Sequence, residues 1–420
     1  MSEENLGEIP RNETPEKFLT KPLIIIYITV FIDLVGFGIV IPLLPYYSES
    51  PTFRATPFEV EIIFAVYSAM QFIFAPVLGS LSDKYGRRPV LFLSIIGSGI
   101  GYLFIGFASV LWMVFAGRII AGITGGNIST AQAYIADITT RENRAKGMGL
   151  FGAMFGLGFI FGPAIGGILS RWGLEVPFLF AAVLTFANAT ALYFFLPETR
   201  RRRETQAPAK NRFAQVFEAL SDPRFSVITI LYFLVITAFS IMTASFALYT
   251  IHRFGFSAEQ NGYLFAYVGV LAIIFQGYLF GKLAKKYGEA NLVVAGTLLL
   301  ISALLVFPFI SPTWGGLIGL LAAMAFFSIG NSLSSPALTS LASKIANEEE
   351  QGKALGVLQS GASLARAIGP IIGGFLIVNT LEKIDDYTLI RTFWTAAGIM
   401  FAGFLFAVYF ATIGKKKVLA

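Results

Sequence analysis

Cysteine is absent from the 420 residues of the chain, and histidine occurs once, as His252. The absence of cysteine excludes disulfide bonds and thiolate metal ligands. No stretch matches the H-E-x-x-H zinc motif or the G-x-x-x-x-G-K-S/T phosphate-binding loop. We therefore expect no metal site, no cofactor and no enzymatic activity.

Charge is also sparse along the chain. Charged residues make up 13% of it, hydrophobic residues make up 55%, and the mean hydropathy is +0.71. These values are too apolar for a soluble protein of this size. Apolar segments that reach the ~20 residues of a membrane-spanning helix begin near residues 23, 58, 89, 111, 147, 176, 225, 260, 291, 315, 355 and 390. The sequence predicts an all-α membrane protein with twelve transmembrane helices.

The basic residues outside these segments are unevenly distributed. If both termini and every even-numbered connection lie on one side, the other side receives only Arg54, Arg171, Arg253, Lys383 and Arg391. Short connections rich in lysine and arginine stay in the cytoplasm. We expect a multi-pass protein of the cell membrane with both termini cytoplasmic. A basic face beside anionic lipid explains the net charge of +6 without a nucleic-acid partner.

Two stretches of the first half recur in the second half. GSLSDKYGR at 79–87 aligns with GKLAKKYGE at 281–289, and GPAIGG at 162–167 aligns with GPIIGG at 369–374. These matches indicate an internal duplication, so we expect two pseudo-symmetric six-helix bundles. The predicted parts are a cytoplasmic tail (1–21), an N-terminal bundle (22–196), a cytoplasmic linker (197–223), a C-terminal bundle (224–413) and a second tail (414–420).

One acid lies inside the first apolar segment, in FIDLVGFGIVIPLLP at 31–45. At 1.5 Å per residue, Asp33 is roughly 16 Å from Pro22 and roughly 18 Å from Pro45, near the middle of the membrane. An ionised acid there costs at least ~2.5 kcal/mol, so such acids face a partner or a wet cavity and usually mark proton or ion paths. Asp33 is therefore a candidate proton carrier. The alternative is a permanent, structural ion pair with an arginine.

Two arginines inside spans compete as that partner. Arg118 is about 10 Å from the predicted outer face, and Arg366 is about 20 Å from the inner face, nearer to Asp33 in depth. Because Arg366 precedes Pro370 by four residues, it also suits a structural role at this bend or an anchor for an anionic substrate. Further polar residues in the middle of spans suit either a binding cavity or hydrogen bonds between helices: Gln71, Asn127, Gln132, Asn188, Gln276, Asn331 and Gln359.

Charges gather at the predicted cytoplasmic ends of spans two and four. Asp83 and Arg87 are four residues apart, close enough to pair on one helical turn, and Asp137 lies at the same depth. The equivalent positions of the second half hold Lys285 and Glu289, so the charges are inverted. These residues either form a latch in the first half or merely follow the positive-inside rule.

Five stretches in the same order carry a family resemblance. They are IDLVGFGIVIPLLP (32–45), GSLSDKYGRRPV (79–90), GRIIAGITGG (117–126), GLGFIFGPAIGG (156–167) and LPET (196–199). From about residue 22 to 413 the sequence resembles a twelve-span transporter of the major facilitator superfamily. Within that family it resembles the drug:proton antiporter group that includes the tetracycline exporters.

The resemblance implies roles for individual residues. It favours Arg118 as the partner of Asp33 in proton coupling. It implies a cytoplasmic gate, closed in the outward-open state, formed by Gly79, Asp83, Gly86, Arg87, Arg88 and Asp137. It implies an antiporter motif in span five at Gly158, Gly162, Pro163, Gly166 and Gly167. The expected cavity takes in Gln71, Asn127, Gln132, Asn331, Gln359 and Arg366.

The sequence also departs from the tetracycline exporters. Span three, LFLSIIGSGIGYLFIGFA at 91–108, lacks the acid that those proteins carry there. The resemblance as a whole implies a monomeric, proton-coupled exporter that works by alternating access. Because of this departure, we expect its substrates to be small lipophilic or amphipathic compounds in general. The alternatives are an exporter of a sugar or an organic anion and, in another class, a channel or a membrane receptor that does not transport.

Overall fold

The computed structural model describes residues 19–199, 223–345, 351–378 and 383–414, and nearly all of them are helical. The N-terminal helices are α1 (Lys21–Ser48), α2 (Pro57–Tyr85), α3 (Arg87–Gly106), α4 (Leu111–Thr124), α5 (Asn127–Ile138), α6 (Arg141–Leu169), η1 (Ser170–Trp172) and α7 (Val176–Phe195). The C-terminal helices are α9 (Pro223–Phe254), α10 (Ala258–Ala272), η2 (Ile273–Leu279), α11 (Phe280–Tyr287), α12 (Glu289–Val306), η3 (Phe307–Phe309), α13 (Gly316–Ile345), α14 (Gln351–Ile377), α15 (Asp386–Tyr409) and η4 (Phe410–Gly414).

Within the described residues, 12 helical segments are long and apolar enough to cross a membrane. Each begins within a few residues of the start expected from hydropathy, so the prediction of twelve transmembrane helices is confirmed. Several spans are composite: α4 and α5 form one span and α10, η2 and α11 form another, while η1, η3 and η4 extend the spans of α6, α12 and α15. The exact boundaries of the two bundles and the linker stay a prediction, and residues 200–222 lie outside the described part of the chain.

Local sequence explains where α2 begins and ends. The Thr56 hydroxyl accepts a hydrogen bond from the backbone N–H of Glu59, and the Glu59 carboxylate accepts one from the N–H of Thr56. This reciprocal pair satisfies two backbone donors that the first turn leaves open. Pro57 then supplies the first helical residue without needing a hydrogen bond. The helix stops at Gly86, whose φ of +105° suits glycine and few other residues.

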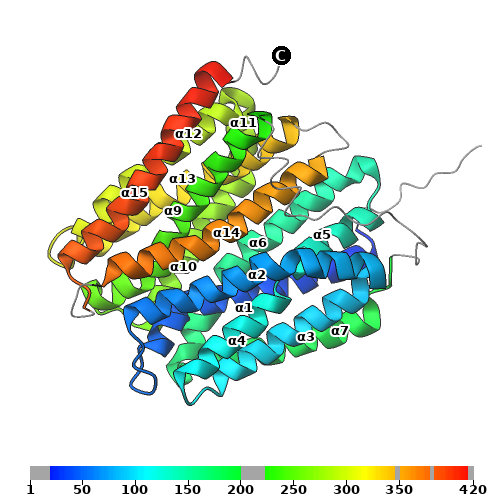
Figure 1. Ribbon diagram of the computed structural model, residues 1–420, viewed down its shortest axis with the longest axis horizontal. Coiled ribbons are helices and arrows are strands. Elements are labelled where there is room, and N and C mark those ends of the chain that lie inside the picture. Colours follow the sequence, from blue (N-terminus) through cyan, green and yellow to red (C-terminus); the bar gives the residue numbers. More distant parts are fainter. Residues whose placement is uncertain (1–18, 200–222, 346–350, 379–382, 415–420) are drawn as a thin grey trace, which may run out of the picture.

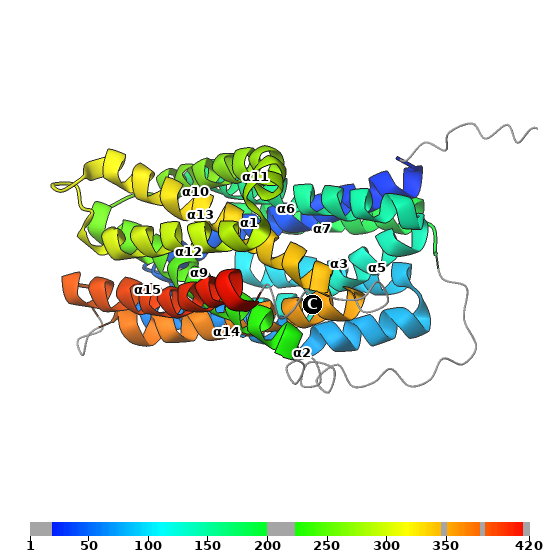
Figure 2. The same ribbon diagram turned by 90° about the horizontal axis from the view of Figure 1, so that it is seen from above.

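The two halves form adjacent groups of helices whose axes run in broadly the same direction (Figures 1 and 2). In the N-terminal half α3 packs on α4 and α7, and in the C-terminal half α12 packs on α13 and α15. Each half has its own buried apolar core. Between the halves, α2 packs on α14 and α6 packs on α10. Large exposed apolar side chains, among them Trp112, Phe194 and Ile318, suit contact with lipid.

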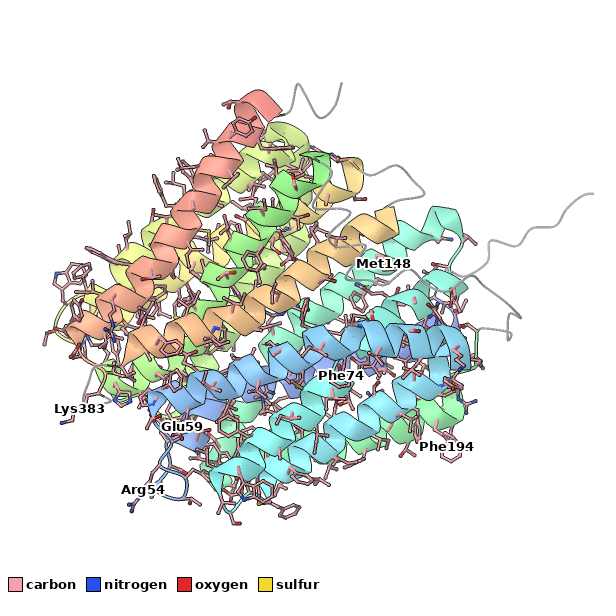
Figure 3. The ribbon with its side chains drawn as sticks, viewed as in Figure 1. Arg54, Glu59, Phe74, Met148, Phe194 and Lys383 are labelled. Carbon is pink, nitrogen blue, oxygen red and sulfur yellow. The ribbon has the colours of Figure 1, made fainter. Side chains whose placement is uncertain are left out.

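We call one end of the bundle the basic end, since Lys84, Arg87, Lys285 and Lys344 lie there at the ends of their helices. The other is the opposite end, where Arg54, Glu59 and Lys383 lie, far from Phe194 (Figure 3). In Figure 1 the two halves meet at the opposite end and diverge toward the basic end.

Candidate functional site

Asp33 lies in the middle of α1 and is half-buried. Its carboxylate accepts a hydrogen bond of 3.4 Å from the amide nitrogen of Asn127. Asn127 is the first residue of α5 and is buried. It is brought to Asp33 by the break between α4 and α5 at Gly125 and Gly126, where the chain restarts a helix inside the span. A half-buried acid with this one long hydrogen bond is poorly stabilised as an anion.

Arg118 is buried in α4, and its guanidinium carbon lies 4.0 Å from the ring centroid of Tyr67. This cation–π contact offsets part of the cost of burying the charge. The Nε atom of Arg118 has no hydrogen-bond partner among the described residues. The Tyr67 hydroxyl is within electrostatic range of Arg118, Asp33 and Arg366.

The expected ion pair between Asp33 and an arginine does not occur in this conformation. Among the residues that the structure describes, no ion pair includes Asp33, Arg118 or Arg366. Arg366 lies on α14, is half-buried, and donates a hydrogen bond of 3.2 Å to the hydroxyl of Ser363. The choice between Arg118 and Arg366 as the partner of Asp33 therefore stays a prediction.

Sequence reasoning did not single out Tyr67. A signal for it exists, because Tyr67 and Gln71 are four residues apart and so share one face of α2. The Gln71 amide donates a hydrogen bond of 2.8 Å to the carbonyl of Gly125, on the neighbouring span. That face of α2 therefore contacts span four twice, through Gln71 at the break between α4 and α5 and through Tyr67 at the guanidinium of Arg118.

The other polar residues expected in the cavity divide into two groups. Gln71 and Asn188 are buried and bond a neighbouring helix, since the Asn188 amide donates 3.2 Å to the carbonyl of Thr29. These two join helices. Gln132 and Asn331 are half-buried, and Gln359 is exposed.

The charged turn between α2 and α3 is assembled as the spacing predicted. Arg87 donates to Asp83 at 2.9 Å through one nitrogen and to Asp137 at 3.1 Å through another. It also donates to the hydroxyl of Ser82 at 2.9 Å. One guanidinium thereby connects α2, α3 and α5. Gly79 is buried one turn before this cluster.

Glu198, which follows α7, was not predicted to be part of this turn. Its two carboxylate oxygens accept hydrogen bonds from the backbone N–H groups of Arg87 (2.9 Å) and Arg88 (3.0 Å). This caps the start of α3 with a negative charge, where the helix dipole favours one. A Cβ built on Gly86 would lie 2.5 Å from Glu198 Oε2, so the close approach also requires glycine there. The Arg88 guanidinium donates to the carbonyl of Tyr193.

The glycines of α6 serve two different contacts. A Cβ on Gly158 would lie 2.5 Å from Leu34, and one on Gly166 would lie 2.7 Å from Leu43. Gly162 also packs on α1, with its Cβ 2.7 Å from Gly38. These three positions, each four residues apart, form the face that packs within the N-terminal half. Gly167 and the carbonyl of Pro163 lie one residue further on and face α10 of the other half, while the Pro163 ring lies beside Gly38 of α1.

The contact between α6 and the span formed by α10, η2 and α11 is close from the opposite end as far as Ile160 and Gly269, and it opens beyond them toward the basic end. A Cβ on Gly167 would lie 3.1 Å from Glu259, one on Gly262 2.6 Å from Pro163, and one on Gly269 2.3 Å from Ile160. The next site on this stripe, Gly156, lies 3.7 Å from Ile273. Beyond it, a Cβ on any of Gly149, Gly152, Gly277 or Gly281 meets nothing within 4 Å. The halves are thus in contact at the opposite end and apart at the basic end.

Polar contacts between the halves reinforce the opposite end. Arg171 binds Glu259, with 2.7 Å between Nε and a carboxylate oxygen. His252 lies 3.2 Å from Glu49. The hydroxyl of Ser245 donates to Glu61 at 2.6 Å.

Comparison with known proteins gives one family. The model of the Major Facilitator Superfamily matches residues 26–349 and 314–419. The tetracycline resistance protein, class H, of Pasteurella multocida is 32% identical over 399 residues, which cover 93% of this chain and 96% of that protein. Multidrug resistance protein 2 of Bacillus subtilis (strain 168) is 28% identical over 358 residues, covering 84% of this chain and 88% of that protein.

A solved structure is similar in both fold and sequence. The human organic anion transporter MFSD10 (TETRAN) superposes with a TM-score of 0.70 at 26% identity, and the match covers 92% of this chain and 99% of that one.

Proposed function

The chain belongs to the Major Facilitator Superfamily, and from that premise we propose that it exports small lipophilic or amphipathic compounds in exchange for protons. Curated relatives that match over most of its length are tetracycline and multidrug resistance proteins. They support a drug exporter of this family, a multi-pass protein of the cell membrane. The finer proposals are proton coupling, a monomeric transporter and the absence of enzymatic activity.

The observation that carries the proposal is the environment of Asp33. The carboxylate lies in the middle of α1, is half-buried, and has a long hydrogen bond from Asn127. An acid in such a place exchanges protons more readily than one held permanently by an arginine. Arg118 and Arg366 both lie within electrostatic range of the same tyrosine, Tyr67. A shift of either arginine toward Asp33 in another conformation would favour loss of its proton.

We propose that the basic end faces the cytoplasm, with both chain termini, as the distribution of lysine and arginine indicates. The present conformation is then inward-open, because α6 and α10 separate toward that end. In this state Asp33 gives its proton to the cytoplasm and the substrate enters. Closure of the basic end and separation of the opposite end would then release the substrate outside.

We assign the predicted gate residues to closure of the basic end. Arg87 holds Asp83 and Asp137 together in this inward-open conformation, so the cluster is already assembled before the halves meet. In the outward-open state we expect this prebuilt surface to contact the C-terminal half. The stripe of Pro163 and Gly167 on α6 supplies the surface on which the halves rock.

Export of an organic anion is the second candidate. Arg366 is half-buried in α14 within electrostatic range of Tyr67 and Tyr232, and no ion pair among the described residues includes it. A cation in that setting suits an anionic ligand. The similarity to the human organic anion transporter supports this alternative. Arg366→Gln would then remove binding of anions and leave that of cations unchanged.

The test of the main proposal is Asp33→Asn in proteoliposomes, with tetracycline and ethidium as probes. The amide nearly preserves the shape of the side chain but cannot carry a proton. We expect uphill accumulation driven by an imposed pH gradient to be lost, while downhill exchange and binding remain. Glu175→Gln, which neutralises an exposed acid between η1 and α7, is the matched control. Undiminished accumulation in Asp33→Asn would return Asp33 to a structural role, and flux without saturation or counterflow would favour a channel.

A further inference from the structure

Glu61 is a second acid that the membrane-spanning part of the protein buries. It is the fifth residue of α2, about 6 Å inside the helix from its start at the opposite end, and its exposed fraction is 0%. Glu59, two residues earlier, caps the helix through Thr56 and is half-buried. The sequence marks Glu59 by its capping distance from Thr56, whereas the burial of Glu61 follows only from the packing of the halves.

The carboxylate of Glu61 lies between the two halves. From α9, the hydroxyl of Ser245 donates to one carboxylate oxygen at 2.6 Å. From α14, a Cβ on Gly373 would lie 3.4 Å from that same oxygen, and one on Gly374 would lie 3.0 Å from the Glu61 Cβ. Glycine at these two positions of α14 therefore makes room for the acid. The second carboxylate oxygen is buried and has no hydrogen-bond partner among the described residues.

The charged groups nearby have other partners. Glu49 lies against His252, and Glu59 caps its own helix. Arg391 donates to the backbone carbonyls of Leu376 and Val378. From α9 and α14, the groups that face Glu61 are the hydroxyl of Ser245 and the backbone of the two glycines.

An ionised carboxylate in this contact would be severely under-solvated. One hydrogen bond does not replace water around a buried anion, whose burial costs several kcal/mol without a partner. The neutral acid fits the same space at far lower cost. Separation of the halves at the opposite end would return Glu61 to water and remove the difference. Proton affinity at Glu61 is therefore linked to whether this end is closed.

We propose that Glu61 is a second proton-binding site, which must hold a proton for the opposite end of the transporter to close. The proposal rests on the proposed function for the statement that this end faces outward. The proton on Glu61 is taken from and returned to the outer side, since the closed contact seals it from the basic end. This proton does not cross the membrane, so Asp33 remains the residue that binds the transported proton. Acid outside would then favour closure of the outer end.

The test is a distance measurement that needs neither substrate nor gradient. The chain has no cysteine, so spin labels attach only at introduced cysteines. Ser109 and Thr313 are exposed, belong to different halves, and lie at the opposite end, and Phe194 and Tyr287 form a matching exposed pair at the basic end. Each pair is placed in an Asp33→Asn background, which removes the titration of Asp33. The pH is then varied from about 5 to about 9, to include the range reported for buried acids.

We expect rising pH to lengthen the distance at the opposite end, with a change of about tenfold or more in the ratio of open to closed molecules. Glu61→Gln and Glu61→Met each remove the titrating group, and both should be closed at this end at every pH. If one of these two Glu61 variants folds poorly, the other still tests the proposal. Glu59→Gln makes the same charge change two residues away and retains capping, so its pH dependence should match the parent.

Two results would overturn the proposal. One is an opposite end in the parent whose distances do not depend on pH. The other is a pH dependence that persists in Glu61→Gln and Glu61→Met, which would assign it to another group. Neither result depends on transport, so a failure here is distinct from a failure of proton-coupled export at Asp33.

Discussion

The turn between α2 and α3 and its counterpart between α11 and α12 align in the sequence, yet they carry opposite charges. In the first turn Arg87 binds Asp137, at the end of α5. In the second turn Glu289 binds Lys344, at the end of α13. Both halves thus hold an ion pair between the start of one span and the end of the next, with the signs exchanged.

The surroundings of the two pairs differ more than the pairs themselves. Gly86 and Gly288 have similar backbone angles, with φ of +105° and +79°. A Cβ on Gly86 would lie 2.5 Å from Glu198, whereas one on Gly288 would meet nothing within 4 Å. Arg87 also binds a second carboxylate, that of Asp83. The N-terminal turn is therefore cross-linked through several side chains, whereas in the C-terminal turn the described partners of Glu289 are Lys344 and the hydroxyl of Ser340.

The largest difference in stability between the two turns should come from replacing Gly86 or Gly288 by alanine. Alanine at either position forces a residue with a Cβ into a backbone region that is nearly confined to glycine, at about 1 to 3 kcal/mol. In Gly86→Ala the methyl group also displaces Glu198 from its cap, for about 1 kcal/mol more. We expect Gly86→Ala to lower the thermal unfolding temperature in detergent more than Gly288→Ala does. Gly281→Ala, in open space within α11, is the control and should be neutral or stabilising by up to about 1 kcal/mol, since alanine favours a helix more than glycine does. Equal losses in the first two variants would mean that the Glu198 contact contributes nothing.

A smaller effect is expected from removing one charge of each turn. Asp83→Asn weakens the hold on Arg87, so it should favour inward-open molecules and depress transport while expression stays largely intact. Because the Asp83 side chain is 48% exposed, the change in population should be about two- to fivefold. Lys285→Gln, at the equivalent position of the second half, should change neither the inward-open population nor transport. The measurement uses spin labels on the basic ends of the two halves, and unchanged populations in Asp83→Asn would refute the latch.

The smallest effect is expected from reversing the C-terminal pair. Glu289→Lys alone places two lysines together and should cost about 0.2 to 1 kcal/mol. Addition of Lys344→Glu restores an attraction of the sign found in the first half, so the double variant should recover wild-type stability. The same reversal in the first half, Arg87→Asp with Asp137→Arg, leaves Asp83 facing a new acid and should not recover. If both double variants recover wild-type stability, Asp83 does not affect the stability of the first turn.

Sequence alone predicted the helices and the charged turn for clear physical reasons. Hydropathy reports length and depth in the membrane, and a spacing of four residues reports one helical face, as with Asp83 and Arg87. Burial between helices has no such local signal. The sequence does not mark Glu61 as buried, and Tyr67 is one of 16 tyrosines. Their positions against Ser245 and Arg118 depend on how distant helices pack.

The divergence of α6 from α10 also makes α6 a lever. From Gly167, where the helices touch, to Gly149, where they are apart, the helix spans about 27 Å. Each degree of rotation about the touching end therefore moves the far end by about 0.5 Å. A methyl group added at Gly167, where the nearest backbone atom would lie 3.1 Å away, would push α6 away from α10 at this contact and change the tilt of α6. A small displacement at Gly167 is therefore enlarged at the basic end of α6.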